Sequence, residues 1–344
     1  MTTEASTKLY AGLDLHANNT YCAVIDQSGQ TVFQRRLLNE LPGIVQALRP
    51  HQPHLQAVAV ESTFNWYWLV DGLQIADFPV LLANPAKIQQ YSGLKRTGDP
   101  SDAHWLAEML RLGILPTGYI YPKAERAVRD MARRRMLVAQ QATRTLLSLQ
   151  SMVSRHTGRM VRGRGLEDWT LVELQEAFAE AASQQTGAAL LELLHEQRRI
   201  EQTLANSVLA RVKLSGAWQR LLTLPGVGNI LGVTIMLETG PIARFASAGD
   251  YASYCRAVDS RRDSNGSKKG ENNRKNGNKY LAWAYVEAAN YAARYNARAQ
   301  VWLAHKMART LRVVAVKALA CKLAKAAYYV LRDNVVFSEQ KMFG

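Results

Sequence analysis

A polar stretch near the C-terminal end, residues 259–278, combines serine hydroxyls with a high density of basic side chains. It reads DSRRDSNGSKKGENNRKNGN and contains no aliphatic or aromatic residue. Ser264 and Ser267 are its two candidate nucleophiles. The basic residues in and beside the stretch are Arg261, Arg262, Lys268, Lys269, Arg274, Lys275 and Lys279. Glycines between them would let the backbone approach a phosphate closely. The composition is typical of a solvated basic loop, and it also fits a loop that presents a serine to a nucleic-acid phosphate.

Four carboxylates in the first third of the chain form a second chemical pattern. Asp14 and Glu61 each end a predicted strand, whereas Asp99 and Asp102 begin a predicted helix. Taken singly, they are explained as strand ends and helix caps. A mixed sheet followed by that helix can instead gather all four at one edge. Carboxylates that close repel each other unless cations neutralise them, and two Mg²⁺ ions about 3.5–4 Å apart are the usual solution for in-line phosphoryl transfer.

The elements that must position these carboxylates follow from hydrophobic alternation. Leu9, Ala11 and Leu13 point to one side of the first strand, and Asp14 points to the other. Further strands are predicted over residues 20–25, 31–35, 56–61 and 79–83, and helices over residues 41–48, 64–73 and from about residue 99. This order predicts a mixed sheet flanked by helices, and we assign residues 1–118 to such a domain.

The middle of the chain, residues 119–215, is predicted to form an antiparallel helical arm, with the coiled coil as one form of it. Residues 123–156 contain no glycine or proline and have strong helical spacing; a short helix is expected over 171–182 and a second long one over 188–212. The first long helix carries Arg126, Arg129, Arg133, Arg134, Arg135 and Arg144. A solvated helix face explains these arginines, but their number favours contact with phosphates, in particular by Arg133, Arg134 and Arg135. The arm could also join subunits.

Residues 216–344 are predicted to form a mainly helical domain. The motif LPGVG, residues 224–228, lies between predicted helices over 218–222 and 229–238 and has the form of a helix–hairpin–helix turn. At such a turn the backbone around Gly226 and Gly228 would donate N–H groups to a phosphate without reading sequence. An ordinary tight turn is the alternative. Helices follow over residues 280–295, 301–309 and 313–332.

Composition limits the class of protein. The formal net charge of +15 and the isoelectric point of about 9.8 indicate a nucleic acid or an anionic membrane as partner. No apolar run reaches the roughly 20 residues of a membrane span, and no signal peptide is recognisable, so we expect no membrane association. Cys22, Cys255 and Cys321 fit neither a disulfide framework nor a zinc site, which favours a reducing cytoplasm. The absence of phosphate-loop and dinucleotide-binding glycine motifs argues against nucleotide hydrolases and dehydrogenases.

The motifs together resemble the DEDD transposases of bacterial insertion sequences, which are bridge-RNA-guided recombinases. The resemblance rests on five segments in the same order: GLDLH, VES, RTGDPSDA, LPGVG and SNGSKKGENNRKNGNKYL. It covers nearly the whole chain. It implies a RuvC-like (RNase-H-like) N-terminal domain, a coiled-coil arm and a C-terminal transposase domain.

Residue by residue, the resemblance assigns metal binding to the four carboxylates and the role of nucleophile to Ser264. The metal-binding set is Asp14, Glu61, Asp99 and Asp102, and two Mg²⁺ ions are expected there. Many members have a Thr-Asp step where this chain has Thr97-Gly98-Asp99. Many also have Ser-Gly where this chain reads Ser264-Asn265-Gly266, so Ser267 remains the second candidate.

The activity implied by the resemblance is DNA strand exchange through a covalent 5′-phosphoserine intermediate. It further implies donor and target double-stranded DNA, a guide RNA that reads both by base pairing, and a homo-oligomer, from dimer to tetramer, with sites shared between subunits. A bacterial cytoplasmic protein associated with the nucleoid is expected. Two alternatives remain open: a RuvC-like or RNase-H-like metal-dependent junction nuclease that uses water, and a non-catalytic nucleic-acid-binding protein.

Overall fold

The computed structural model describes residues 8–88, 99–212, 215–258, 261–264, 267–271 and 276–344. For residues 99–101, 163–164, 261–264 and 268–271 it describes the backbone alone. The described chain forms two compact units that divide between Lys123 and Ala124. In these residues no helix has the length and apolar character needed to cross a bilayer. The three cysteines are free thiols, as the sequence predicted.

The N-terminal unit is built on a six-stranded mixed sheet. Its strands are β1 (Leu9–Leu15), β2 (Asn19–Asp26), β3 (Thr31–Leu38), β4 (Leu55–Glu61), β5 (Val80–Ala83) and β6 (Thr117–Gly118). The order across the sheet is β3-β2-β1-β4-β5-β6, with β1, β4 and β5 parallel and the other pairings antiparallel. This confirms the predicted mixed sheet. The sequence did not reveal β6, because two residues are too short for an alternating pattern.

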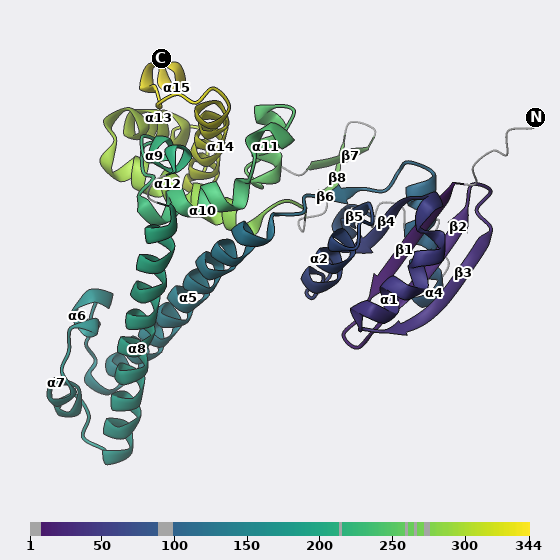
Figure 1. The fold of residues 1–344 in the computed structure, drawn as a ribbon. Coiled ribbons are helices and arrows are strands. Elements are labelled where there is room, and N and C mark those ends of the chain that lie inside the picture. Colours follow the sequence, from purple (N-terminus) through teal and green to yellow (C-terminus); the bar gives the residue numbers. More distant parts are fainter. Residues whose placement is uncertain (1–7, 89–98, 213–214, 259–260, 265–266, 272–275) are drawn as a thin grey trace, which may run out of the picture. The chain divides into compact units, whose positions relative to one another are not determined.

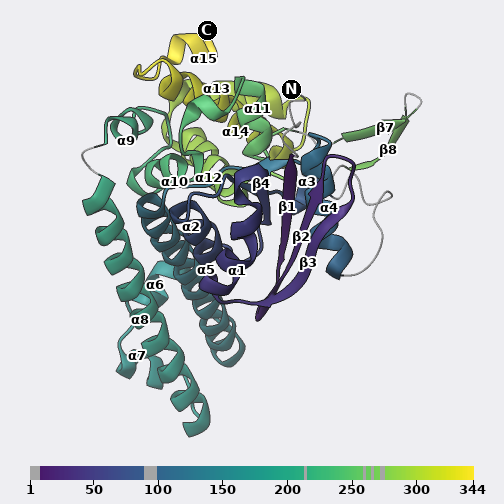
Figure 2. The ribbon, with the colours of Figure 1, turned by 45° about the vertical axis from the view of Figure 1, so that its right-hand side comes forward.

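Helices cover both faces of this sheet (Figures 1 and 2). They are α1 (Leu41–Leu48), a 3-10 turn η1 (Arg49–His54), α2 (Tyr67–Ile75), α3 (Pro85–Ile88) and α4 (Asp99–Arg111). Leu13 and Val60 point from the strands into a core shared with α1 and α2. Ala59 points to the opposite face, where it packs with Leu106 and Met109 of α4. The predicted alternation of β1 and β4 is confirmed, because each face buries its own set of apolar residues.

The second unit begins with two long antiparallel helices. Its first elements are α5 (Lys123–Thr157), α6 (Gly163–Glu167), α7 (Leu171–Glu176) and α8 (Ala181–Val212). Leu149 and Met152 of α5 pack with Leu194 of α8 toward the far end of the pair, beside α6 and α7 (Figure 1). Val128 of α5 packs near Val212 of α8 at the opposite end. The chain therefore runs out along α5 and returns along α8.

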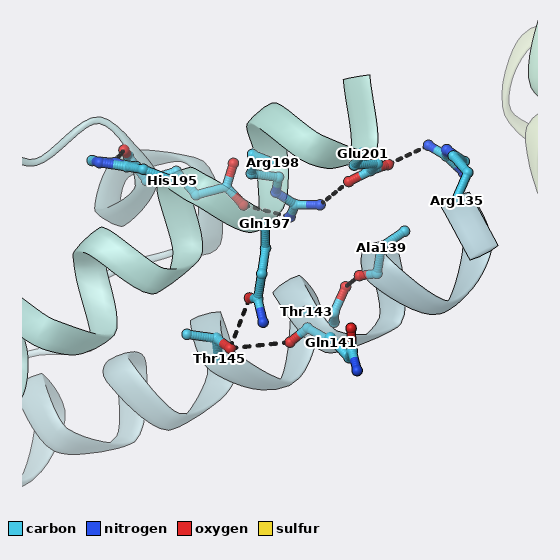
Figure 3. A network of polar contacts seen from close by, with 10 residues as sticks. Arg135, Ala139, Gln141, Thr143, Thr145, His195, Gln197, Arg198 and Glu201 are labelled. Carbon is cyan, nitrogen blue, oxygen red and sulfur yellow. Dashed lines mark hydrogen bonds and ion pairs between the residues drawn. The ribbon is translucent and has the colours of Figure 1, made fainter. Parts of the chain in front are cut away.

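Polar contacts also fasten the two long helices to each other (Figure 3). Arg135 of α5 forms an ion pair with Glu201 of α8, and Arg198 binds the other oxygen of Glu201 at 2.9 Å. Arg198 also reaches Glu167 of α6 at 2.6 Å. The Thr145 hydroxyl donates to the Gln197 side chain at 2.9 Å.

The predicted helix over residues 171–182 is wrong in its extent. It ends at Glu176, and α8 already begins at Ala181. The Phe178 ring is buried between them, and a Cβ atom on Gly187 would lie only 2.7 Å from it. The connection between α7 and α8 is thus set by a contact between Phe178 and Gly187, and a glycine inside α8 is needed to admit the ring.

The remaining helices form one apolar core. They are α9 (Gly216–Leu221), α10 (Asn229–Thr239), a 3-10 turn η3 (Ile242–Arg244), α11 (Ala248–Tyr254), α12 (Lys279–Tyr295), α13 (Ala297–Met307), α14 (Arg312–Arg332) and α15 (Glu339–Phe343). The core is rich in small residues such as Ala288, Ala292 and Ala320, which let α12 and α14 approach closely. α13 starts four residues before the predicted position because the Asn296 side chain caps it, accepting from the Ala299 N–H at 2.9 Å.

The polar stretch is not irregular throughout, contrary to its interpretation as a loop. It contains an antiparallel hairpin of β7 (Arg261–Ser264) and β8 (Ser267–Glu271). The register sets Arg261 opposite Glu271 and Asp263 opposite Lys268. A polar, glycine-containing composition argues against a buried strand, but a short two-stranded hairpin needs only backbone hydrogen bonds between its strands.

Candidate active site

The first two predicted carboxylates end neighbouring parallel strands. β1 and β4 are paired through Gly12 opposite Ala59 and Leu13 opposite Val60, so Asp14 and Glu61 occupy the next position of the same register. Adjacent residues in register point to the same face of a sheet. This is the face covered by α4, because Ala59 packs against that helix. Asp14 is buried, at 4 % exposure, and Glu61 is partly exposed.

Gly12 brings the third carboxylate to the same face. A Cβ atom on Gly12 would lie 2.1 Å from the Ala103 carbonyl oxygen and 2.7 Å from the Ala107 backbone nitrogen. The first half of α4 therefore rests directly on the backbone of β1, and any side chain at position 12 would force it away. Asp102 precedes Ala103 in α4, so this contact sets its height above the sheet. The Asp99 backbone lies in the same helix, one turn before Ala103, and its side chain is outside the description.

The loop after β1 is held by two asparagines. Asn39 donates to the carbonyl oxygens of His16 at 2.9 Å and Ala17 at 3.0 Å, and Asn65 donates to the His16 carbonyl at 3.0 Å. The His16 ring Nε2 lies 3.1 Å from an Asp14 carboxylate oxygen. The His16 ring therefore lies directly against the Asp14 carboxylate.

Hard oxygen ligands of this kind suit Mg²⁺. Asp14, Glu61 and Asp102 share one face and one end of the sheet, which fits the predicted metal-binding role in residue type and placement. Among the described side chains, no group of three acidic, histidine or cysteine residues is close enough to enclose an ion. The Asp99 side chain, the fourth member of the predicted set, is not among them.

The predicted nucleophiles lie in the second unit, at the tip of the β7–β8 hairpin. Ser264 ends β7, Ser267 begins β8, and the two face each other in the register. Ser267 is exposed; of Ser264, Arg261, Arg262, Lys268 and Lys269 the structure describes the backbone only. Arg274 and Lys275 lie outside the described residues, and Lys279, the first residue of α12, is exposed.

A buried polar network anchors the chain where it leaves the polar stretch. The Asn278 side chain caps α12 by accepting from the N–H groups of Tyr280 at 2.8 Å and Leu281 at 3.1 Å. Its amide group donates to Glu238 of α10 at 2.7 Å. Arg133 of α5 binds the same Glu238 with two hydrogen bonds of 2.5 and 2.8 Å. The network therefore joins the base of the arm to the point at which α12 begins.

The network also stabilises the charged form of Arg133. Burial opposes the charge on Arg133, but its hydrogen bonds and its attraction to Glu238 outweigh that cost, so the pKa of Arg133 lies above its ordinary value. Its guanidinium carbon lies 4.5 Å from the centre of the Tyr280 ring. Glu238 is only 2 % exposed. An ionised carboxylate at such depth is stable only with partners of this kind.

The arginines predicted to bind nucleic acid differ in how much charge they can offer. Arg133 and Arg135 are occupied by Glu238 and Glu201, whereas Arg134 between them is exposed. In the LPGVG turn, a Cβ atom on Gly226 would lie 2.0 Å from the Ala288 carbonyl oxygen of α12. Gly226 therefore has a packing role, with φ of +77°. Gly228 is exposed and precedes α10 as its N-cap.

Sequence reasoning missed the residues that support these groups. Gly12, Asn39, Asn65 and Glu238 carry no local signal for their contacts, because each contact joins segments far apart in the chain. Asn278 offered a signal: asparagine directly before a helical pattern is a typical N-cap.

Two comparisons identify the class and the family. A DEDD transposase model of the IS110 type matches residues 11–157, and the model of the transposase IS116/IS110/IS902 family matches residues 218–302. The two matches define the class as a transposase, an enzyme that acts on DNA. Together the matches span more than half of the chain, which belongs to the IS110 family of insertion-sequence transposases. The comparison with curated proteins finds no match.

Proposed function

We propose that this transposase exchanges DNA strands through a covalent bond between Ser264 and a DNA phosphate. The Ser264 hydroxyl oxygen attacks the phosphorus atom, the bond from phosphorus to the 3′ oxygen breaks, and a 5′-phosphoserine and a free 3′ hydroxyl result. A 3′ hydroxyl from another strand then attacks the phosphoserine and releases the serine. Each step exchanges one phosphoester bond for another, so the strands are resealed without ATP.

The observation that carries this proposal is the register of β1 and β4. It sets Asp14 and Glu61 at equivalent positions on the face where α4 rests on Gly12. DEDD-type transposase domains usually depend on a divalent metal. We propose that Asp14, Glu61, Asp99 and Asp102 hold two Mg²⁺ ions, which when bound would activate the serine and stabilise charge on the phosphorane.

The chain's own residues have separate roles in this proposal. His16 keeps the Asp14 carboxylate oriented through its 3.1 Å contact. Basic residues of the polar stretch, Arg261, Arg262, Lys268, Lys269, Arg274, Lys275 and Lys279, neutralise the phosphate. The backbone around Gly228 and the exposed Arg134 contact further phosphates, which positions DNA without reading its sequence.

Sequence choice is proposed to come from a guide RNA. A protein of net charge +15 is suited to holding nucleic-acid backbones, and base pairing of one RNA to donor and target would then supply specificity. Purifying the protein and sequencing the RNA that accompanies it tests this part. A discrete RNA with two loops that match the DNA flanking the element supports it, and recovery of random cellular RNA would contradict it.

The serine step is tested with a matched pair of variants on one hairpin. Ser264→Ala should abolish strand exchange and the denaturant-resistant protein–DNA adduct, whereas Ser267→Ala should keep both. The opposite result would move the role to Ser267. A junction nuclease that uses water would still cut DNA with Ser264→Ala, so continued cleavage without an adduct would replace this proposal with that alternative.

The carboxylates are tested in the same assay. Asp14→Asn and Glu61→Gln should lower adduct formation by at least about 10²-fold, the scale on which lost charge stabilisation acts in catalysis. Unchanged strand exchange in both variants would exclude a catalytic role for the carboxylates and favour a protein that only binds nucleic acid.

A further inference from the structure

A pocket in the C-terminal part of the second unit is unrelated to the carboxylates and to the serine hairpin. It has a volume of about 480 Å³ and lies between the last turns of α14 and the segment that leads to α15. Both family models end before it, since the second match stops at residue 302. Ligand pockets in proteins range from about 300 to 1,000 Å³, so this one has room for a ligand the size of a nucleotide.

The lining combines two chemistries. Its apolar part is contributed by Val330, Val335, Val336, Phe337, Met342 and the ring of Tyr329. Its cationic part consists of Lys322, Lys325 and Lys341. In the described part of the chain none of these three amines forms an ion pair with a carboxylate. The pocket therefore combines an apolar surface with a net positive charge.

The acids nearest to the pocket already have cationic partners. Asp333, the acidic residue of the lining, binds Arg332 at 2.7 and 3.1 Å. Glu339 accepts from the Asn296 amide at 2.5 Å and lies 3.5 Å from Arg298. Asp333 also attracts Lys341, but the three lysines outnumber the one carboxylate of the lining, so the pocket as a whole favours an anion.

The wall opposite α14 is held in place by contacts to other helices. Arg220 of α9 donates to the Asn334 side chain at 2.7 Å, and the Phe337 N–H donates to the Thr223 hydroxyl at 2.9 Å. On the α14 side, the Lys322 amine lies 5.5 Å from the centre of the Trp302 ring. A pocket whose walls are fixed in this way binds a ligand without the entropy cost of ordering its lining.

We propose that this pocket binds one unpaired nucleotide of a single-stranded nucleic acid, with the base on Tyr329 and the apolar lining and the phosphate near the lysines. Tyr329 is 46 % exposed, and the Arg332 guanidinium carbon lies 4.8 Å from the centre of its ring, so a base would stack on the other face. Aromatic stacking together with backbone neutralisation is the usual way in which proteins hold single strands. The inference uses only the nucleic-acid class of the substrate and is independent of Ser264 and of the metal ligands.

The test is binding of labelled oligonucleotides to the full chain, measured by fluorescence anisotropy. Single-stranded DNA, single-stranded RNA and a DNA duplex of about 12 nucleotides are compared, a length within the usual site size. Tyr329→Ala should weaken binding of single strands on the order of tenfold, and Tyr329→Phe should restore it. The type of single strand that loses more affinity, DNA or RNA, identifies the source of the nucleotide.

Matched controls separate the pocket from general charge. Tyr295→Ala removes a 71 % exposed tyrosine from the end of α12, outside the pocket. Lys306→Gln with Arg309→Gln removes as much charge as Lys325→Gln with Lys341→Gln. The pocket pair should weaken single-strand binding several-fold more than the control pair. Equal losses in the two pairs, equal losses for duplex and single strand, or unchanged binding in Tyr329→Ala would each overturn the proposal.

Photo-crosslinking gives a readout that does not depend on affinity. An oligonucleotide containing 5-iodouracil is irradiated with the wild-type chain, and the modified peptides are mapped by mass spectrometry. Adducts on residues 322–342 support the pocket. Adducts confined to the arm and the hairpin would contradict it, as would a change in self-association of the Tyr329→Ala chain with no change in crosslinking.

Discussion

Glu238 shows how strongly one buried side chain can constrain its surroundings. It is almost fully enclosed and receives hydrogen bonds from Arg133 and Asn278. Removing one partner of a buried ion pair leaves the other charge without compensation, which costs far more than the pair itself contributes. The same site also shows that a run of arginines is not a uniform surface. Arg133 serves the fold, and its neighbour Arg134 is free to face solvent.

The two neighbouring arginines give a matched stability test. Arg133→Ala should lower the free energy of unfolding by about 3 kcal/mol, because Glu238 loses its cationic partner. Arg134→Ala should change it by less than about 0.5 kcal/mol, as is usual for an exposed residue. Urea denaturation of both variants measures the difference. Coinciding transitions for the two variants would show that the pair does not stabilise the protein.

At the scale of elements, the position of α4 depends on the absence of a side chain on β1. Gly12 allows the backbone of the helix to rest on the strand, which fixes Asp102 over the face that carries Asp14 and Glu61. The second unit contains a similar close contact, in which Gly226 lets the LPGVG turn pack directly on the backbone of α12. Both glycines belong to motifs that the sequence linked to chemistry, and the structure gives each a packing role.

Two Gly→Ala substitutions in the N-terminal unit separate this packing role from general glycine effects. Gly12→Ala should destabilise the unit by about 1–3 kcal/mol through overpacking. It should also lower strand exchange on the order of 10²-fold, because a shift of about 1 Å misplaces catalytic groups. Gly43→Ala, in α1 with open space around it, should leave activity unchanged and stabilise the helix slightly.

Thermal unfolding and the adduct assay, run on both glycine variants, give the two readouts. A Gly12→Ala chain with wild-type activity would show that α4 can shift without moving the carboxylates from their working positions.

At the scale of the whole molecule, the proposed carboxylates and the proposed nucleophile belong to different compact units. Asp14, Glu61 and Asp102 lie before the division at Lys123, and Ser264 lies after it. Each unit has its own apolar core, one between the sheet and its helices and one among α9 to α14. The proposed mechanism therefore needs residues of both units, taken from one chain or from two.

Mixing two inactive variants distinguishes these arrangements. If the site is shared between subunits, Asp14→Asn mixed with Ser264→Ala should recover activity, because a mixed dimer contains one site with neither substitution. Equal mixing should restore roughly a quarter of the wild-type sites in a dimer with freely exchanging subunits. Recovery is measured as adduct formation after co-expression. A mixture as inactive as each variant alone would place both halves of the site in one chain.

Much of the fold was predictable because its signals are local. Alternation in β1 and β4 identified the two sheet faces, and the glycine-free run from Lys123 identified α5. The spacing of Asp99 and Asp102 indicated the helix α4. These patterns depend on neighbours within a few residues, which the sequence shows directly. The family motifs could be recognised in the sequence for the same reason, since each is a short run of neighbouring residues.

The tertiary structure decided the matters that depend on distant partners. It alone showed that Arg133 pairs with Glu238 whereas Arg134 does not. It also showed that Phe178 is buried between α7 and α8, and that the polar stretch contains a hairpin. It alone assembled the pocket at Tyr329 from two segments of ordinary composition. Sequence by itself determined which residues could take part in chemistry and which faces of the elements are apolar. Only long-range packing decided which of those residues already have partners within the protein, because the partners of a side chain depend on the fold and not on its neighbours in the chain.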